Sequence, residues 1–201
     1  MARPRRAVVA KLDAGSIKEP SEGIRRKVAK AVGKQTLFLI SSANFSETVQ
    51  MLVKIITNEM VHEAIYLSTH DSFRFLANYF NDELVDINKI SFIDCVSKTM
   101  GIRVVNERIF LVDSVSNLGS IDSAVSNLMA LLKGEDNFFI LDSIEGLVIS
   151  NSEKDSIDFI GQIVSKMRNL KMTGIYFAIK EERDSRMIQK LEKIFEQVIE
   201  I

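Results

Sequence analysis

Short apolar runs, most of them followed by a segment with helical character, recur along most of this chain and constrain its fold more than any other feature. The runs are TLFLIS, EAIYLST, ISFIDCVS, NFFILDSI and TGIYFAIK, and their polar residues stand mainly at the ends. Strands that are apolar on both faces are typical of parallel sheets covered by helices on both sides. The sequence therefore predicts an α/β domain of three layers, α/β/α, around a mostly parallel sheet.

The segments between the apolar runs give the expected order of elements. Ser21 is placed to cap a first helix, whose apolar residues recur every four positions and which ends near Gly33. Asp71 is expected to cap the helix after the second strand. In full, helices are predicted over residues 21–34, 45–60, 71–84, 120–134, 152–172 and 185–195, with further strands at 108–114 and 197–201.

Charge divides the chain into a basic beginning and an acidic body. Residues 1–35 hold ten Lys or Arg against three acids, a net charge of +7, and the remainder carries a net charge of −8. We expect a basic arm over residues 1–20 and a single domain over residues 21–201, opened by a basic helix at 21–34. Contacts with an anionic partner would use Arg3, Arg5, Arg6, Arg25, Arg26, Lys27 and Lys30.

Such an arm can bind nucleic acid, an anionic membrane or the acidic body of a neighbouring copy. The alternative is a solvated tail followed by one helix. The arm contains no aromatic residue that could stack on single strands, which disfavours that mode of nucleic-acid binding.

Several kinds of chemistry are excluded by the residues that are missing. The single cysteine, Cys95, cannot form an internal disulfide, and the apolar runs are too short to span a bilayer, so a cytoplasmic location is expected. Two histidines and one cysteine, widely separated, do not form a zinc site. The sequence has neither a G-x-S-x-G nor a G-x-G-x-x-G motif.

The polar segments that follow the apolar runs carry a family resemblance. SSANFSET after the first strand and FFILDS near residue 140 stand in the order that resembles the RecA/KaiC-like P-loop ATPases, over roughly residues 35–201. The likeness is greatest to small archaeal KaiC-like proteins with degenerate nucleotide sites. It implies a RecA-like sheet, a Walker B strand ending at Asp142, and IFEQVIEI as the last strand.

The loop after the first strand has the layout of a P-loop without its chemistry. A working P-loop, G-x-x-x-x-G-K-[ST], wraps phosphates with backbone N–H groups and adds a lysine and a hydroxyl. Ser41 and Ser46 stand at the glycine positions. Glu47 replaces the lysine, so repulsion replaces attraction, and only Thr48 keeps its role. The vestigial nucleotide site would comprise Ser41, Asn44, Ser46, Glu47, Thr48, Asp142 and Ser143.

Glu47 has a second interpretation. If Asn44 is the helix N-cap, then N-x-x-E is a variant of the capping box, and the Glu47 carboxylate would lie where an ATPase holds phosphate. Glu47→Ala would then cost about 1 kcal/mol of stability. The alternative is an ordinary surface glutamate in a first helical turn.

Catalytic groups are also missing. KaiC-like ATPases are expected to carry a carboxylate pair after the second strand, where this chain has Ser68, Thr69 and His70. His70 is either a base or, by preference, a solvated polar residue, and His62 is interpreted in the same way. Thr48 and Asp142 are expected to lie close together as a plain hydrogen-bonded pair. The run KEERDSR after the last long strand is mixed in sign and is interpreted as a solvated helix start.

Two classes of function remain open at this stage. The first is a non-catalytic pseudo-ATPase that acts as a regulatory, signalling or scaffold protein through protein contacts, assembling with itself or with an active relative. It would need no cofactor, and Mg–ATP is not favoured. The second is a nucleotide- or DNA-binding accessory protein that uses the basic arm. An ATPase with an unorthodox loop is a weaker third possibility.

Overall fold

A seven-stranded, wholly parallel sheet organises the molecule, in the strand order β4-β3-β2-β5-β6-β1-β7. The computed structural model describes residues 19–60, 62–104, 106–134 and 136–201. The basic arm predicted over residues 1–20 therefore lies almost entirely outside the described residues. The strands are β1 (Gln35–Ile40), β2 (Ala64–Ser68), β3 (Ile90–Asp94), β4 (Ile109–Leu111), β5 (Phe138–Leu141), β6 (Thr173–Ile179) and β7 (Gln197–Glu200).

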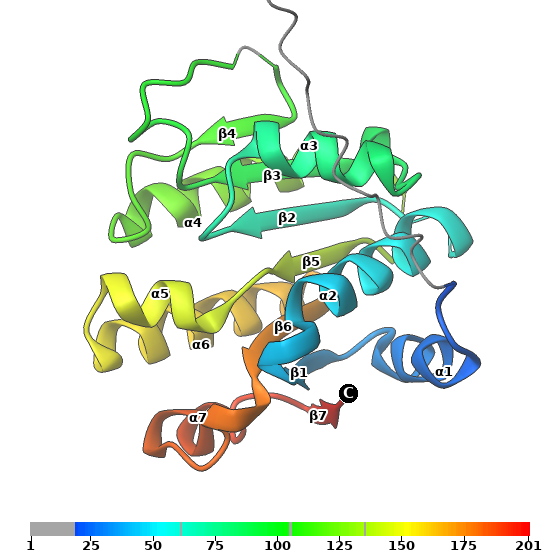
Figure 1. The fold of residues 1–201 in the computed structure, drawn as a ribbon. Helices are drawn as coiled ribbons and strands as arrows, with labels where there is room; N and C mark the ends of the chain where they lie inside the picture. The colour runs from blue at the N-terminus through cyan, green and yellow to red at the C-terminus, as the bar shows by residue number, and fades with distance from the viewer. Residues whose placement is uncertain (1–18, 61, 105, 135) are drawn as a thin grey trace, which may run out of the picture.

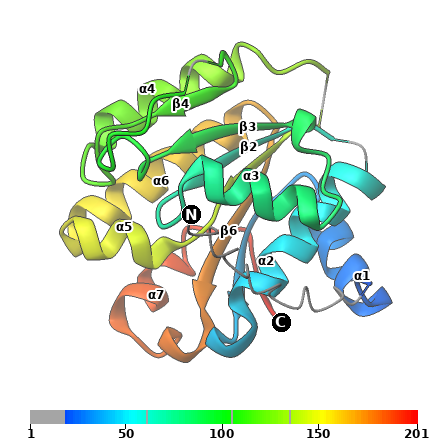
Figure 2. The ribbon, with the colours of Figure 1, turned by 45° about the horizontal axis from the view of Figure 1, so that its top comes forward.

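Helices connect these strands and cover both faces of the sheet, as Figures 1 and 2 show. They are α1 (Glu22–Ala31), α2 (Phe45–Lys54), α3 (Phe73–Asp82), α4 (Leu118–Met129), α5 (Ile144–Ser150), α6 (Glu153–Asn169) and α7 (Arg186–Leu191). The predicted three-layer α/β/α architecture with a parallel sheet is confirmed.

Two apolar cores lie on the two faces of the sheet, because alternate residues of each strand point in opposite directions. In β1, Leu37 and Leu39 join the core under α4, α6 and α7, whereas Phe38 and Ile40 join the core under α1, α2 and α3. Every residue of β1, β2, β3 and β5 is buried. This double burial explains why these strands read as continuous apolar runs.

Capping residues and glycines in the sequence predicted the ends of the first helix correctly. Ser21 caps α1 by accepting a hydrogen bond from the backbone N–H of Ile24, and Gly33 takes up the left-handed conformation expected after the helix. The second helix ends in a π-helical turn at Ile55–Glu59. The helix α5, which the sequence did not predict, inserts between β5 and α6.

The prediction that Asp71 caps α3 is wrong, because Ser72 does so. The Ser72 hydroxyl accepts a hydrogen bond from the backbone N–H of Phe75. Asp94, at the end of the neighbouring strand β3, accepts a second bond from the backbone N–H of Phe73, at 2.6 Å. The start of α3 is therefore fixed by one residue of its own and one from β3.

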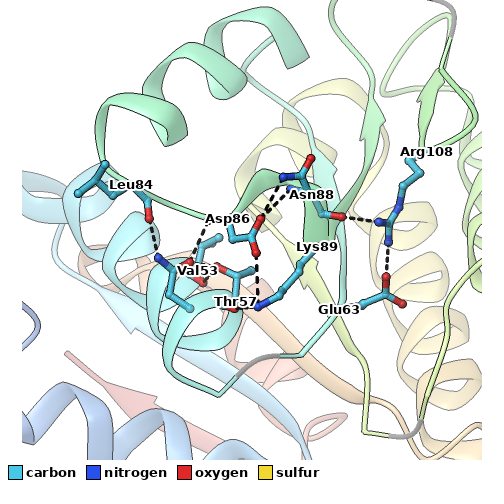
Figure 3. A network of polar contacts seen from close by, with 9 residues as sticks. Val53, Thr57, Glu63, Leu84, Asp86, Asn88, Lys89 and Arg108 are labelled. Carbon is cyan, nitrogen blue, oxygen red and sulfur yellow. Dashed lines mark hydrogen bonds and ion pairs between the residues drawn. The ribbon is translucent and has the colours of Figure 1, made fainter.

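A polar network joins the elements at the edge of the sheet where β2, β3 and β4 begin (Figure 3). Arg108 donates to Glu63 at 2.6 Å and to the backbone carbonyl of Asn88. Lys89 donates to the carbonyl of Thr57 at 2.9 Å and pairs with Asp86 at 3.4 Å. These contacts stabilise the edge of the sheet at which the strands begin. They do not involve the opposite, carboxyl edge, where the strands end.

None of the helices in the described ranges is long and apolar enough to cross a membrane.

Candidate functional site

A cavity of about 390 Å³ opens at the carboxyl edge of the sheet, beside the ends of β2, β5 and β6. In open parallel α/β sheets, this edge is where ligands bind. The walls come from the loop after β1, from α2, from the start of α3 and from α5. The lining residues are Ser42, Phe45, Ser46, Val49, Gln50, Tyr66, His70, Asp71, Leu76, Phe80, Asp142, Ser143, Glu145, Ile149 and Ile179.

The loop after β1 holds a carboxylate, and the carboxylate belongs to Glu181. Its two oxygens accept hydrogen bonds from the Ser41 hydroxyl and from the backbone N–H of Ser42, each at 3.0 Å. Hydrogen bonds from the Ser42 N–H, from the backbone of Glu181 itself and from the Ser41 hydroxyl lower the pKa of Glu181. A side chain from the segment after β6 thus occupies a donor pair that, in a P-loop layout, would face a phosphate.

Glu47 does not make the contact predicted for it. Asn44 occupies the N-cap position of α2 and Glu47 lies in the first turn, as expected, but the Asn44 side chain accepts no capping bond. Glu47 is exposed, and in the described part of the chain its carboxylate has no hydrogen-bonding partner. The capping box fails because a 3-10 turn, Ser42–Asn44, precedes the helix and leaves Asn44 with φ −123° and ψ 15°.

Asp142 is a buried carboxylate at the end of β5. It accepts hydrogen bonds from the Ser68 hydroxyl at 2.7 Å, the Thr69 hydroxyl at 2.8 Å and the Thr69 backbone N–H at 3.0 Å. Burial raises the pKa of Asp142, although these bonds and the nearby His70 oppose that shift. The predicted pairing with Thr48 is not formed: Thr48 is a buried residue of α2 and is not among the cavity residues.

His70 and Asp71 lie at the cavity in the loop before α3. His70 is exposed, and its Nδ1 lies 2.9 Å from the Thr69 hydroxyl. Asp71 is half-buried, and burial raises the pKa of its carboxyl. His62 lies elsewhere and is partly buried, with its ring 5.3 Å from that of Phe138.

Glu145 closes the cavity between α5 and β6, and the sequence did not point to it. Its carboxylate accepts bonds from the Ser143 hydroxyl at 2.9 Å and from the backbone N–H of Ile179 at 2.7 Å. Ser143 caps α5 through the backbone N–H of Gly146. Apolar residues at Ile144, Leu147 and Val148, one helical turn after a serine, are the signal that would have revealed this helix.

Gly146 lets two elements approach each other closely. A Cβ atom on Gly146 would lie 2.2 Å from the Thr69 hydroxyl oxygen and 2.6 Å from the His70 ring. Only glycine therefore allows α5 to pack against the loop that carries Thr69 and supports Asp142.

Two carboxyl-edge residues next to the cavity have structural roles. The Asp94 carboxylate is buried and accepts the backbone N–H groups of Phe73, Val96 and Ser97. Cys95 is a free, buried thiol whose pKa is raised by burial, which is the inert state expected from the sequence.

The described basic residues of the first helix mostly contact the protein itself. Arg25 forms a two-bonded pair with Glu59, Arg26 pairs with Glu22 at 3.0 Å, and Lys27 donates to the carbonyl of Glu200 at 2.7 Å. Lys30 is exposed. Arg3, Arg5 and Arg6 lie outside the described residues.

Comparisons with known proteins give a fold and no family. Neither a protein-family model nor a curated protein matches this chain. Among solved structures, the chain is similar to the KaiC-like protein PH0186 of the archaeon Pyrococcus horikoshii. The identity is 16%, the TM-score is 0.56, and the match covers 84% of this chain and 71% of that protein.

Two further structures from Pyrococcus horikoshii are similar. One is the uncharacterized protein PH0321 in complex with an unknown peptide, with 13% identity, a TM-score of 0.64, and coverage of 89% of this chain and 82% of that protein. The other is PH0250, with 12% identity, a TM-score of 0.58, and coverage of 88% and 87%. The chain therefore has a KaiC/RecA-like fold, as its motif order indicated.

Proposed function

We propose that this protein is a non-catalytic KaiC/RecA-like pseudo-ATPase that acts as a regulatory or scaffold protein through contacts with other proteins. The observation that carries the proposal is the pair of hydrogen bonds from Ser41 and Ser42 to Glu181. With a carboxylate on these donors, a polyphosphate would have to displace a negative charge and would gain no lysine in exchange.

The charge around the cavity supports the same conclusion. Asp71, Asp142 and Glu145 line it, and no Lys or Arg among the described residues does. KaiC-like ATPases are expected to carry a carboxylate pair after the second strand, where this chain has Ser68, Thr69 and His70 and then the single carboxylate of Asp71. The Asp142 carboxylate already accepts bonds from Ser68 and Thr69 and serves to hold the loop after β2.

A role in protein contacts is supported by the surface near the cavity. Ile149 in α5 lines the cavity and is 81% exposed. Large apolar side chains exposed at the rim of a hollow occur at interaction sites. The similar protein PH0321 was crystallised with an unknown peptide, which is the kind of partner we propose here.

Calorimetric titration of the full chain with Mg–ATP tests the proposal. We expect no saturable heat and no increase in melting temperature, and micromolar binding would overturn the pseudo-ATPase assignment. The matched variant Glu181→Ser removes the resident carboxylate. Weak nucleotide binding that appears in this variant alone would identify Glu181 as the excluding group.

Two companion measurements address the partner. Light scattering after size exclusion reports whether the chain assembles with itself. A gel-shift titration with DNA, with and without residues 1–35, tests the alternative accessory role of the basic arm. That role requires a shift that weakens steeply with salt and disappears with residues 1–35, and no shift for the full chain would remove it.

A further inference from the structure

The exposed side of α3 carries two aromatic rings and two carboxylates in one row. Phe75, Tyr79, Asp82 and Glu83 recur at helical spacing, which places them on the same side of the helix. Phe75 is 55% exposed, and its ring stacks on that of Tyr79 with centroids 6.2 Å apart and planes inclined by 7°. These four residues are called the α3 row below.

The carboxylates of the α3 row stand where a helix favours cations. The C-terminal end of a helix carries a partial negative charge, yet α3 has Asp82 and Glu83 there and no basic residue in its last turn. Burial raises the pKa of the Tyr79 hydroxyl against its hydrogen bond with Gln50. The negative charges of Glu83 and Glu47 raise that pKa further, so a third carboxylate, from α2, lies near the same ring.

These three carboxylates lack cationic partners in direct contact. Within the described ranges, the side chains of Glu47, Asp82 and Glu83 form neither a hydrogen bond nor an ion pair. The α3 row is therefore an acidic and aromatic surface that a segment with both positive charge and apolar side chains would complement.

The described part of the chain begins close to this surface. The carboxylate of Glu19 lies 3.9 Å from the Lys54 ammonium of α2 and 3.7 Å from the Arg25 guanidinium. Lys54 also lies near Glu83, because its positive charge opposes the rise that burial causes in the pKa of Glu83. The chain before Glu19 therefore joins the described structure near the C-terminal end of α3.

Residues 1–18, which lie outside the described residues, have the composition that the α3 row lacks. They hold five Lys or Arg against one acid, a net charge of +4, and the apolar run AVVA at 7–10. Eighteen extended residues reach about 60 Å, whereas the row from Phe75 to Glu83 is about 12 Å long. Tethering also gives such a segment an effective concentration on the order of millimolar, so weak contacts suffice.

We propose that the basic segment at residues 1–18 docks on the α3 row of its own chain. Its Lys and Arg side chains would pair with the three carboxylates, and its apolar run would pack on the stacked rings of Phe75 and Tyr79. An anionic partner of the basic segment would then have to displace it from α3. The inference goes beyond the proposed function and does not rest on it.

Other occupants fit the α3 row less well. An anionic partner would be repelled by three carboxylates. A wholly apolar partner would bury Asp82 and Glu83 without a cation to pair with them. The basic segment of a second copy has the same chemistry, but it lacks the tether that raises the effective concentration.

The test is paramagnetic broadening in the full, ¹⁵N-labelled chain with a nitroxide attached through Ala7→Cys. Cys95 is buried and its pKa is raised by burial, so it should not take up the label, and the intact mass verifies a single nitroxide. We expect loss of the backbone amide signals of Phe75, Tyr79 and Glu83. The signals of α7, which packs on the other face of the sheet, should keep their intensity.

Charge reversal localises the contact. Asp82→Lys combined with Glu83→Lys reverses the charge of the α3 row and suits the end of the helix, so the fold should be retained. Glu182→Lys combined with Asp184→Lys makes the same change of charge at exposed positions before α7 and is the matched control. We expect the first variant to restore the α3 signals and the control to leave them broadened.

A second pair of variants tests the aromatic part of the surface. Phe75→Ala removes the outer ring of the stacked pair, and Leu170→Ala shortens an apolar residue that is 51% exposed after α6. The broadening at Tyr79 and Glu83 should weaken in Phe75→Ala alone. Equal broadening in the two variants would contradict the packing of the apolar run on these rings.

A mixed sample separates one chain from two. It combines the nitroxide-labelled chain without ¹⁵N and the ¹⁵N-labelled chain without nitroxide. Broadening of α3 signals within the labelled chain but not in the mixture supports the proposal. Broadening of equal strength in the mixture would assign the α3 row to the segment of a second copy and overturn it.

The absence of broadening at α3 in the labelled chain, or equal broadening in the two charge-reversal variants, would also overturn the proposal. The Mg–ATP titration does not involve the α3 row. Nucleotide binding would therefore overturn the pseudo-ATPase assignment and not this inference.

Discussion

The carboxylate that holds the loop after β1 belongs to Glu181, although the sequence pointed to Glu47. Glu47 has the expected sequence position next to the helix start, yet it points to solvent without a described partner. Glu181 is 139 positions away from Ser42 in the chain and supplies the carboxylate that accepts its N–H. Parallel strands bring such residues together because β1 and β6 are neighbours and end at the same edge.

Gly146 provides a residue-scale prediction with a matched control. Gly146→Ala should destabilise the protein by about 1–3 kcal/mol, because its Cβ would overlap Thr69 and His70. Gly161→Ala lies within α6, where the nearest atom to the added Cβ is 3.9 Å away, and should stabilise by about 0.5–1 kcal/mol. Urea unfolding of both variants measures the difference. A Gly146→Ala variant as stable as the wild type would refute the close packing of α5.

Asp142 makes the stability of the protein depend on pH. Burial raises its pKa, so the native chain binds this proton more readily than the unfolded chain. The contribution of Asp142 to stability therefore falls as the pH rises from the unfolded pKa of about 3.9 through the raised native pKa. Asp142→Asn removes this titration, and its stability relative to the wild type should increase with pH across that window.

Urea unfolding at a series of values from about pH 4 to pH 8 measures this difference. Asp184→Asn, an exposed substitution of the same chemistry, is the control and should track the wild type at every pH. If the stability of Asp142→Asn relative to the wild type stays constant or decreases with rising pH, the assignment is contradicted.

At the scale of elements, the start of α3 provides a prediction about capping. Ser72→Ala should cost about 1 kcal/mol, because it frees the backbone N–H of Phe75. Asp71→Ala should cost less, since its carboxylate bonds to no described donor. Thermal unfolding ranks the two variants, and a larger loss for Asp71→Ala would return the capping role to Asp71.

At the same scale, some helices and strands of this fold could be predicted from the sequence and others could not. The strands β1, β2, β3, β5 and β6 were predicted because burial on both faces makes them continuously apolar. The helix α5 was missed because its seven residues follow a strand directly and merge with its apolar run. Gln35 was not assigned to β1, since its burial at 1% exposure depends on bonds to Met172 and Tyr176 across the sheet.

The sequence predicted where the candidate site lies, but only some of the residues that form it. Asp142, Ser143, Ser46 and the loop after β1 do lie at one carboxyl edge, because parallel strands end together. Glu145 and Glu181 were missed, because each acts through contacts with residues distant in sequence. The run KEERDSR has the mixed charges of a solvated segment. No local pattern in it indicates that Glu181 would accept hydrogen bonds from the loop after β1.

At the scale of the whole molecule, the chain has a KaiC/RecA-like fold, and the cavity at the carboxyl edge of its sheet has acidic and apolar walls. The two faces of the sheet carry separate cores, and Figure 2 shows the helices that cover each of them. The opposite edge is held by the Arg108 and Lys89 contacts of Figure 3.

The Ser42 backbone amide is the most direct probe of this account, because Glu181 accepts its hydrogen bond. Its NMR resonance can be followed in the full chain during a titration with Mg–ATP. We expect the wild-type resonance to stay in place throughout the titration. Its position should change only in the Glu181→Gln variant, where the hydrogen bond is weaker. A saturable shift of the Ser42 amide with Mg–ATP in the wild type would contradict the account.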